Sequence, residues 1–74
     1  MAVVDKIMKW NAVEYVTRVT YRRSDLTYVR ECYKYADDAI KDGVRMVNDG
    51  TATMVVILGV AKSGEAKPMY AVSP

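Results

Sequence analysis

Polar and apolar residues alternate most regularly between residues 12 and 23. One set of alternate positions is β-branched or aromatic, namely Val13, Tyr15, Thr17, Val19 and Tyr21. A period of two with this enrichment is typical of a strand with one buried face. The pattern therefore predicts a strand whose Tyr15 and Tyr21 face the core, with Arg18 and Arg22 on the outside.

A helical pattern follows. From Leu26 onward, residues three or four positions apart place the apolar side chains in an arc of about half the helix circumference. The set is Leu26, Val29, Cys32, Tyr33, Ala36, Ala39, Ile40, Gly43, Val44, Met46 and Val47. Ser24 and Asp25 are suited to an N-cap and first turn, and Asn48-Asp49-Gly50 is typical of a helix end. We expect one helix from residue 24 to residue 47, with Cys32 packed. Gly43 either allows close approach to a neighbour or marks a break.

The remaining segments predict strands and turns. Thr51–Lys62 contains a continuous apolar run, which indicates a central strand covered on both faces. Ser63–Pro68 predicts a turn, and Met69–Val72 predicts a short strand that forms a hairpin with the preceding one. Val3–Trp10 favours a short helix, and an edge strand is the alternative.

Together these elements predict a small α+β fold in a single domain, residues 1–74. The expected layout is β-α-β-β, with one long amphipathic helix packed on a three-stranded sheet and a short N-terminal helix. A right-handed crossover through the helix would make the strand at 12–23 and the strand at 51–62 parallel neighbours.

One helix covers only one face of a sheet, yet both rows of the strand at 51–62 are apolar. The second face needs another cover, which is the N-terminal segment with Trp10, a second copy of the chain, or a partner protein. Val56 and Leu58 are the candidate partner-binding residues on the strand. Tyr28 and Tyr35, at one edge of the expected helix, are candidate interface anchors, or else half-buried boundary residues.

Composition and charge set limits on function. The 74 residues are 51% hydrophobic and 27% charged, which is the balance of a folded domain with a small core. The net charge is +2, and residues 1–24 hold five basic and two acidic side chains. A lone cysteine indicates a reducing compartment, so we expect a cytoplasmic protein. The N-terminus does not resemble a signal peptide, and the apolar runs are too short to cross a membrane.

The sequence offers little chemistry. Histidine is absent, so a Ser-His-Asp or Cys-His device cannot form. The segment from Gly59 to Gly64 lacks the glycines that a phosphate loop requires. Asp38 and Asp42 lie one helical turn apart, but a solvated helix face explains them better than a metal site. We therefore expect neither an enzyme nor a cofactor, a metal or a small-molecule substrate.

These observations favour a non-enzymatic intracellular binding protein, an inhibitor or adaptor that occupies a surface on another macromolecule and forms a homodimer. The layout is similar to that of small phage-encoded proteins that bind and block a host factor, a likeness of size and architecture only. The first alternative is a nucleic-acid-binding protein, whose basic and aromatic side chains would be Lys9, Trp10, Arg18, Arg22 and Arg23. The second is a structural subunit of a larger assembly such as a virion.

Overall fold

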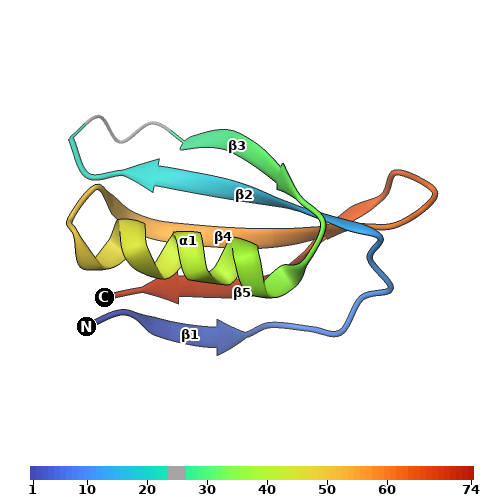
Figure 1. The fold of residues 1–74 in the computed structure, drawn as a ribbon, viewed down its shortest axis with the longest axis horizontal. Helices are drawn as coiled ribbons and strands as arrows, with labels where there is room; N and C mark the ends of the chain where they lie inside the picture. The colour runs from blue at the N-terminus through green and yellow to red at the C-terminus, as the bar shows by residue number, and fades with distance from the viewer. Residues whose placement is uncertain (24–26) are drawn as a thin grey trace.

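The computed structural model describes the backbone of residues 1–23 and 27–74, and the side chains of residues 1–23 and 32–74. Within this part, one helix packs on an antiparallel sheet of five strands in the order β1-β5-β4-β2-β3 (Figure 1). The elements in chain order are β1 (Val3–Lys6), β2 (Glu14–Tyr21), β3 (Thr27–Tyr33), α1 (Ala36–Asn48), β4 (Ala52–Val60) and β5 (Ala66–Ser73). The α+β class with a single packed helix is confirmed.

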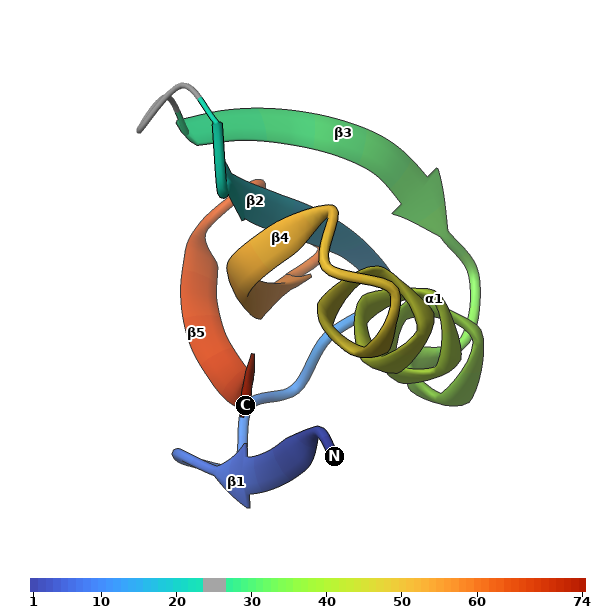
Figure 2. The same cartoon turned by 90° about the vertical axis from the view of Figure 1, so that its left-hand side faces the viewer.

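The sheet curves around the helix, as the end-on view shows (Figure 2). Register shifts occur in three of its strand pairs, β2 with β3, β2 with β4, and β4 with β5. Such bulges bend a strand and increase its twist. We call the face that carries α1 the inner face and the opposite one the outer face.

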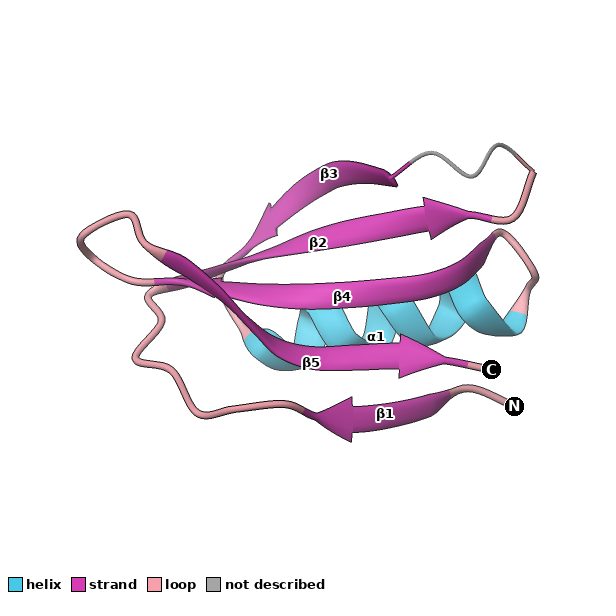
Figure 3. Ribbon diagram, turned by 180° about the vertical axis from the view of Figure 1, so that it is seen from behind, coloured by secondary structure: helices cyan, strands magenta, loops and turns pink. Residues whose placement is uncertain are grey.

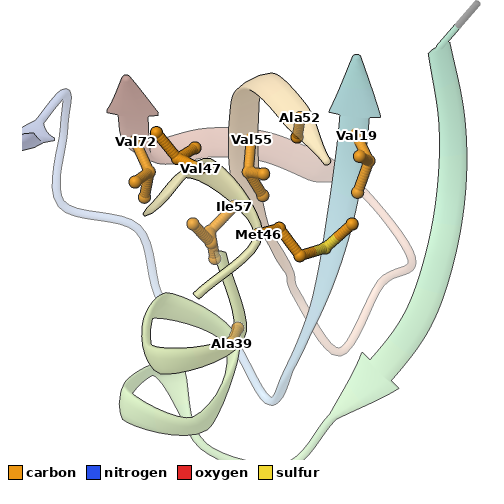
Figure 4. Packing of buried hydrophobic residues seen from close by; sticks show 8 residues of the cluster. All are labelled: Val19, Ala39, Met46, Val47, Ala52, Val55, Ile57 and Val72. Carbon is orange, nitrogen blue, oxygen red and sulfur yellow. The ribbon is translucent and has the colours of Figure 1, made fainter. Parts of the chain in front are cut away.

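The core lies between α1 and the inner face (Figure 4). Its buried members come from the helix and from β2, β4 and β5: Val19, Ala39, Met46, Val47, Ala52, Val55, Ile57 and Val72. Tyr15 and Tyr21 pack against this cluster and Arg18 and Arg22 are exposed, as the alternation predicts. The Tyr33 hydroxyl donates a hydrogen bond to Asp42, which ties β3 to the helix.

The helix is continuous through Gly43, so close approach explains this glycine. A Cβ at Gly43 would lie 3.1 Å from Cγ1 of Val55 and 3.4 Å from Cγ2 of Val72. The predicted helix end is also confirmed. Asp49 is the C-cap residue, and Gly50 follows it with a φ of 83°, which glycine adopts readily.

The predicted start of the helix is wrong. Residues 27–33 form strand β3, and the helix begins at Ala36. Val16 of β2 pairs with Cys32 of β3, and Arg18 of β2 pairs with Val29 of β3. Two positions along β2 therefore correspond to three positions along β3, which is a β-bulge. This bulge interrupts the period of two, and the resulting spacing of three resembles a helix. The proposed N-cap, Ser24 and Asp25, lies outside the described residues. Cys32 is exposed, so its expected burial is also wrong.

Two further expectations are corrected. The strands β2 and β4 are adjacent but antiparallel. The N-terminal segment forms edge strand β1, the alternative to the favoured helix, and pairs with β5. The sheet therefore has five strands in the described residues instead of the expected three, and the layout is not β-α-β-β. The final strand starts at Ala66, earlier than expected. Its Pro68 is tolerated because the pairing of β5 with β1 ends at Tyr70.

Asp49 gives the helix C-terminus a pH-dependent contribution. Its Oδ1 accepts a hydrogen bond from the Thr51 amide at 2.9 Å. The hydrogen bonds from the Thr51 side chain and amide lower the pKa of Asp49 below its ordinary value of 3.8, and Arg45 adds to the effect. A lowered folded-state pKa stabilises the protein above the unfolded-state pKa, and this stabilisation disappears as the pH falls through the folded-state value.

We therefore expect Asp49→Ala to lower the melting temperature at pH 7, with a difference that shrinks as the pH falls below about 4. Thermal unfolding of both proteins, followed by circular dichroism between about pH 7 and pH 2, measures this difference. An equal difference at every pH would show that the carboxylate charge does not contribute.

Candidate binding surface on the outer face of the sheet

Strand alternation places two rows of side chains on the outer face. The row from β2 is Glu14, Val16, Arg18 and Thr20, and the row from β4 is Met54, Val56, Leu58 and Val60. Backbone pairing sets Glu14 opposite Val60, Val16 opposite Leu58, and Arg18 opposite Val56. We call Val16, Val56, Leu58 and Val60 the outer-face cluster. The expected common face of Val56 and Leu58 is confirmed.

The cluster is apolar and partly accessible. Leu58 is 8% exposed, while Val16, Val56 and Val60 are half-buried. Met54, the next β4 residue in this row, is 42% exposed. Seen from behind the helix, this face has no second layer of the described chain over it (Figure 3).

The N-terminal segment does not cover the cluster. Strand β1 extends the sheet at its edge by pairing with β5. Further along, the Trp10 indole donates a hydrogen bond to the Glu65 carbonyl, and Lys67 Nζ lies 4.5 Å from the Trp10 ring centroid. Lys67 pairs with Gly59, and Gly59 lies on the inner face with Ile57 by strand alternation. Because Lys67 contacts the Trp10 ring, Trp10 lies on the inner side of the sheet. Of the three covers considered from the sequence, a second copy and a partner protein remain.

Two opposite charges border the cluster. Glu14 and Arg18 are both exposed, lie on the outer face of β2, and flank Val16 at equal distances along the strand. Neither is in an ion pair among the described residues, where the ion pairs are Asp42–Arg45, Arg45–Asp49 and Glu65–Lys67. Sequence reasoning selected Arg18 but missed Glu14. The same alternation that placed Arg18 outside would have identified it.

The two candidate tyrosine anchors do not form one surface. Tyr28 lies in β3, where its backbone pairs with Val19, and its side chain is outside the described residues. Tyr35 is the N-cap residue of α1 and is 60% exposed. The Lys34 ammonium lies 5.7 Å from the Tyr35 ring centroid. Their expected alignment on one helix edge is therefore wrong, because the helix does not reach residue 28.

The basic residues considered for nucleic-acid binding are also dispersed. Lys9 and Trp10 lie between β1 and β2, at the start of β2, whereas Arg22 and Arg23 follow its end. An eight-residue strand separates these two groups by roughly 25 Å. Arg18 lies between them on the outer face, and Arg22 Nε donates a hydrogen bond of 3.0 Å to the Gly50 carbonyl. The structure does not bring these residues to one site.

Other kinds of site are not found in the described part of the chain. It contains no detected pocket and no group of three or more His, Cys, Asp or Glu residues placed to hold a metal ion. Its helix is too short and too polar to cross a membrane.

Comparison with known proteins gives no family. No protein-family model matches the chain, and neither the curated proteins nor the solved structures include a significant match. The interpretation of the outer face therefore depends on its geometry and chemistry.

Proposed function

We propose that the protein is a non-enzymatic binding protein that self-associates and occupies a surface on another macromolecule, as an inhibitor or adaptor. Its contact surface is the outer face of the sheet. The observation that carries this proposal is the outer-face cluster, four apolar side chains in the middle of a face that no described element covers.

An antiparallel sheet with one face in water normally alternates apolar residues inside with polar residues outside. Strand β4 departs from this rule, since its outer row is entirely apolar. The solvated face of α1 shows the usual pattern, because Asp37, Asp38, Lys41 and Arg45 are all exposed and charged. An apolar centre bordered by charged and polar residues is the composition of a protein interface. This contrast between the two surfaces favours binding over a purely solvated sheet.

The alternative functions make different predictions for the same face. A nucleic-acid-binding protein would depend on the arginines, and its affinity would fall steeply with salt. A structural subunit would use the same apolar cluster but would form large open assemblies instead of closed dimers. Sedimentation over a range of salt concentrations, with and without a single-stranded oligonucleotide, distinguishes the three.

The proposal predicts the effect of one substitution. Val56→Asp places a carboxylate in the outer-face cluster, opposite Arg18 of β2. It should raise the self-association Kd by about tenfold, because even a paired charge loses its hydration when a partner covers it. It should also reduce the retention of protein partners on an immobilised chain. Sedimentation equilibrium measures the first effect, and quantitative mass spectrometry of the retained proteins measures the second.

The matched control is Lys41→Asp, which introduces the same side chain on the exposed face of α1. It should leave both readouts unchanged. Circular dichroism of each variant verifies that the fold persists. If folded Val56→Asp protein self-associates and retains partners as the unmodified chain does, the outer face is not the contact surface and the proposal is wrong.

A further inference from the structure

We infer that the occupant of the outer face is a second copy of this chain, packed face to face about a two-fold axis. The axis lies in the interface, crosses β2 at Val16 and runs perpendicular to the strands. This inference depends on the proposed function, since it names the partner that the outer face binds in the free protein.

The charges on β2 support this axis. Glu14 and Arg18 lie two residues before and two residues after Val16, both on the outer face and both exposed. They are about 13 Å apart along the strand, too far to pair with each other. Rotation about the axis through Val16 exchanges their positions. Glu14 of one copy then faces Arg18 of the other, and the symmetry creates this pair twice.

The apolar rows are consistent with the same axis. Val16 and Leu58 are cross-strand partners at the level of the axis, so each would face its own counterpart across the interface. The cross-strand pairs on either side of the axis are Glu14 with Val60 and Arg18 with Val56. The rotation therefore also places Val60 of one copy against Val56 of the other. Apolar groups meet apolar groups at the centre, and opposite charges meet at the border.

The area that this axis buries is that of a weak, transient dimer. The strands extend only two residues beyond Val16 on one side, so the two copies overlap over about 13–16 Å of strand length; five strands about 4.8 Å apart then give roughly 350 Å² per copy, or about 700 Å² in total. Specific interfaces begin near 1,000 Å² of total buried surface. Since the buried area is below that value, the association should be weak, and it should be measured up to about millimolar concentrations.

A second two-fold arrangement has a different charge pattern. Its axis runs parallel to the strands, between β4 and β5. Arg18 pairs with Val56, Val56 with Ala71, and Ala71 with Asp5, so these residues lie at the same level of the sheet. Rotation about this axis therefore sets Arg18 against Asp5 of the second copy. In that arrangement Val16 lies beyond Lys6, the last paired residue of β1, so it faces no strand residue of the second copy. It buries less of the outer-face cluster, and the experiment below separates the two.

Charge reversal tests the pairing. Arg18→Glu and Glu14→Arg each replace two attractive pairs by two repulsive ones, so each should raise the dimer Kd by about tenfold. The double variant Glu14→Arg/Arg18→Glu restores opposite charges and should return the Kd to within about threefold of the unmodified value. Both residues are exposed, so the fold should tolerate the changes. Sedimentation equilibrium provides the constants.

Cross-linking tests the position of the axis. In a Cys32→Ser background, Val16→Cys places one thiol from each copy on the axis, within reach of a short bismaleimide. Thr20→Cys, on the same strand and face but away from the axis, is the matched control. Rapid dimer formation by the Val16 variant alone is expected. Equal cross-linking of both variants would contradict the proposed axis.

The outcomes separate this inference from the proposed function. A monomer at all concentrations overturns the inference, but the proposed binding role survives if Val56→Asp still reduces the retention of partners. A dimer that charge reversal leaves unchanged also overturns it. Rescue of Arg18→Asp by Asp5→Arg, but not by Glu14→Arg, would assign the parallel axis instead.

Discussion

Replacing Ile57 by alanine is expected to lower the free energy of unfolding by about 2–5 kcal/mol. Ile57 has no exposed surface and lies on β4 in the middle of the core cluster, beneath the helix (Figure 4). The substitution removes three carbon atoms and leaves a cavity between two layers. A 74-residue domain has a total stability of roughly 4–11 kcal/mol, so this single change removes a large part of it.

Urea denaturation followed by circular dichroism measures the loss, and each kcal/mol should lower the melting temperature by about 4–8 °C. The control Ile57→Val keeps most of the side chain and should cost about 0.5–1.5 kcal/mol. A second control is Val56→Ala on the outer face, where the half-buried side chain should contribute less. If Ile57→Ala cost no more than Val56→Ala in the monomer, the helix would not pack as described.

The strongest sequence pattern predicted its element well. The alternation between residues 12 and 23 matches β2 from Glu14 to Tyr21, although Val13, just before the strand, is exposed instead of buried, and the apolar run at 51–62 matches β4. Both strands are central, so burial determines their residue types. The end of the helix was also predictable, because Asp49 and Gly50 are determined by local cap geometry.

The strand β3 could not be read in the same way. A bulge opposite Thr17 shifts its alternation by one residue, so Val29 and Cys32 both pair with the outer-face row of β2 although they are three positions apart. In a single sequence, this spacing is indistinguishable from a helical one. The distinction requires the neighbouring strand, which is tertiary information.

That one missed strand accounts for the wrong direction of β4. A strand followed directly by a helix returns the chain to its starting end, so the next strand runs parallel to the first. Strand β3 adds one more passage along the sheet before α1. Strand β4 therefore runs antiparallel to β2. Errors in strand number and in strand direction thus have the same physical origin.

The candidate site was predictable as far as side-chain alternation determines it. Val56 and Leu58 on one face, and Arg18 outside, follow from a period of two. The pairing of Val16 with Leu58, which centres the outer-face cluster, depends on the register of β2 with β4 and not on either strand alone. The predicted proximity of Tyr28 and Tyr35 was wrong because it assumed a helix through both residues, and the helix begins only at Ala36.

Gly59→Ala tests a second close contact, between β4 and the N-terminal segment. A Cβ at Gly59 would overlap the Met69 sulfur and would lie 2.8 Å from the Ala12 Cβ. In an unobstructed strand this substitution would stabilise the protein by reducing the entropy of the unfolded chain. Here the crowding should dominate and destabilise the protein by about 1–3 kcal/mol. The sign of the change therefore reports the crowding at Gly59, and only its coupling to residue 12 reports whether the segment before β2 packs on the inner side of β4.

The matched test is a double-mutant cycle with Ala12→Gly, measured by urea denaturation. Ala12→Gly removes the carbon atom that opposes the new Cβ and leaves only the Met69 side chain, whose end can move. The double variant should therefore be more stable than the sum of the single changes predicts, by about 0.5–3 kcal/mol of coupling. Additive effects would mean that residues 7–13 do not contact β4. In that case the N-terminal segment would again be a candidate cover for the outer face.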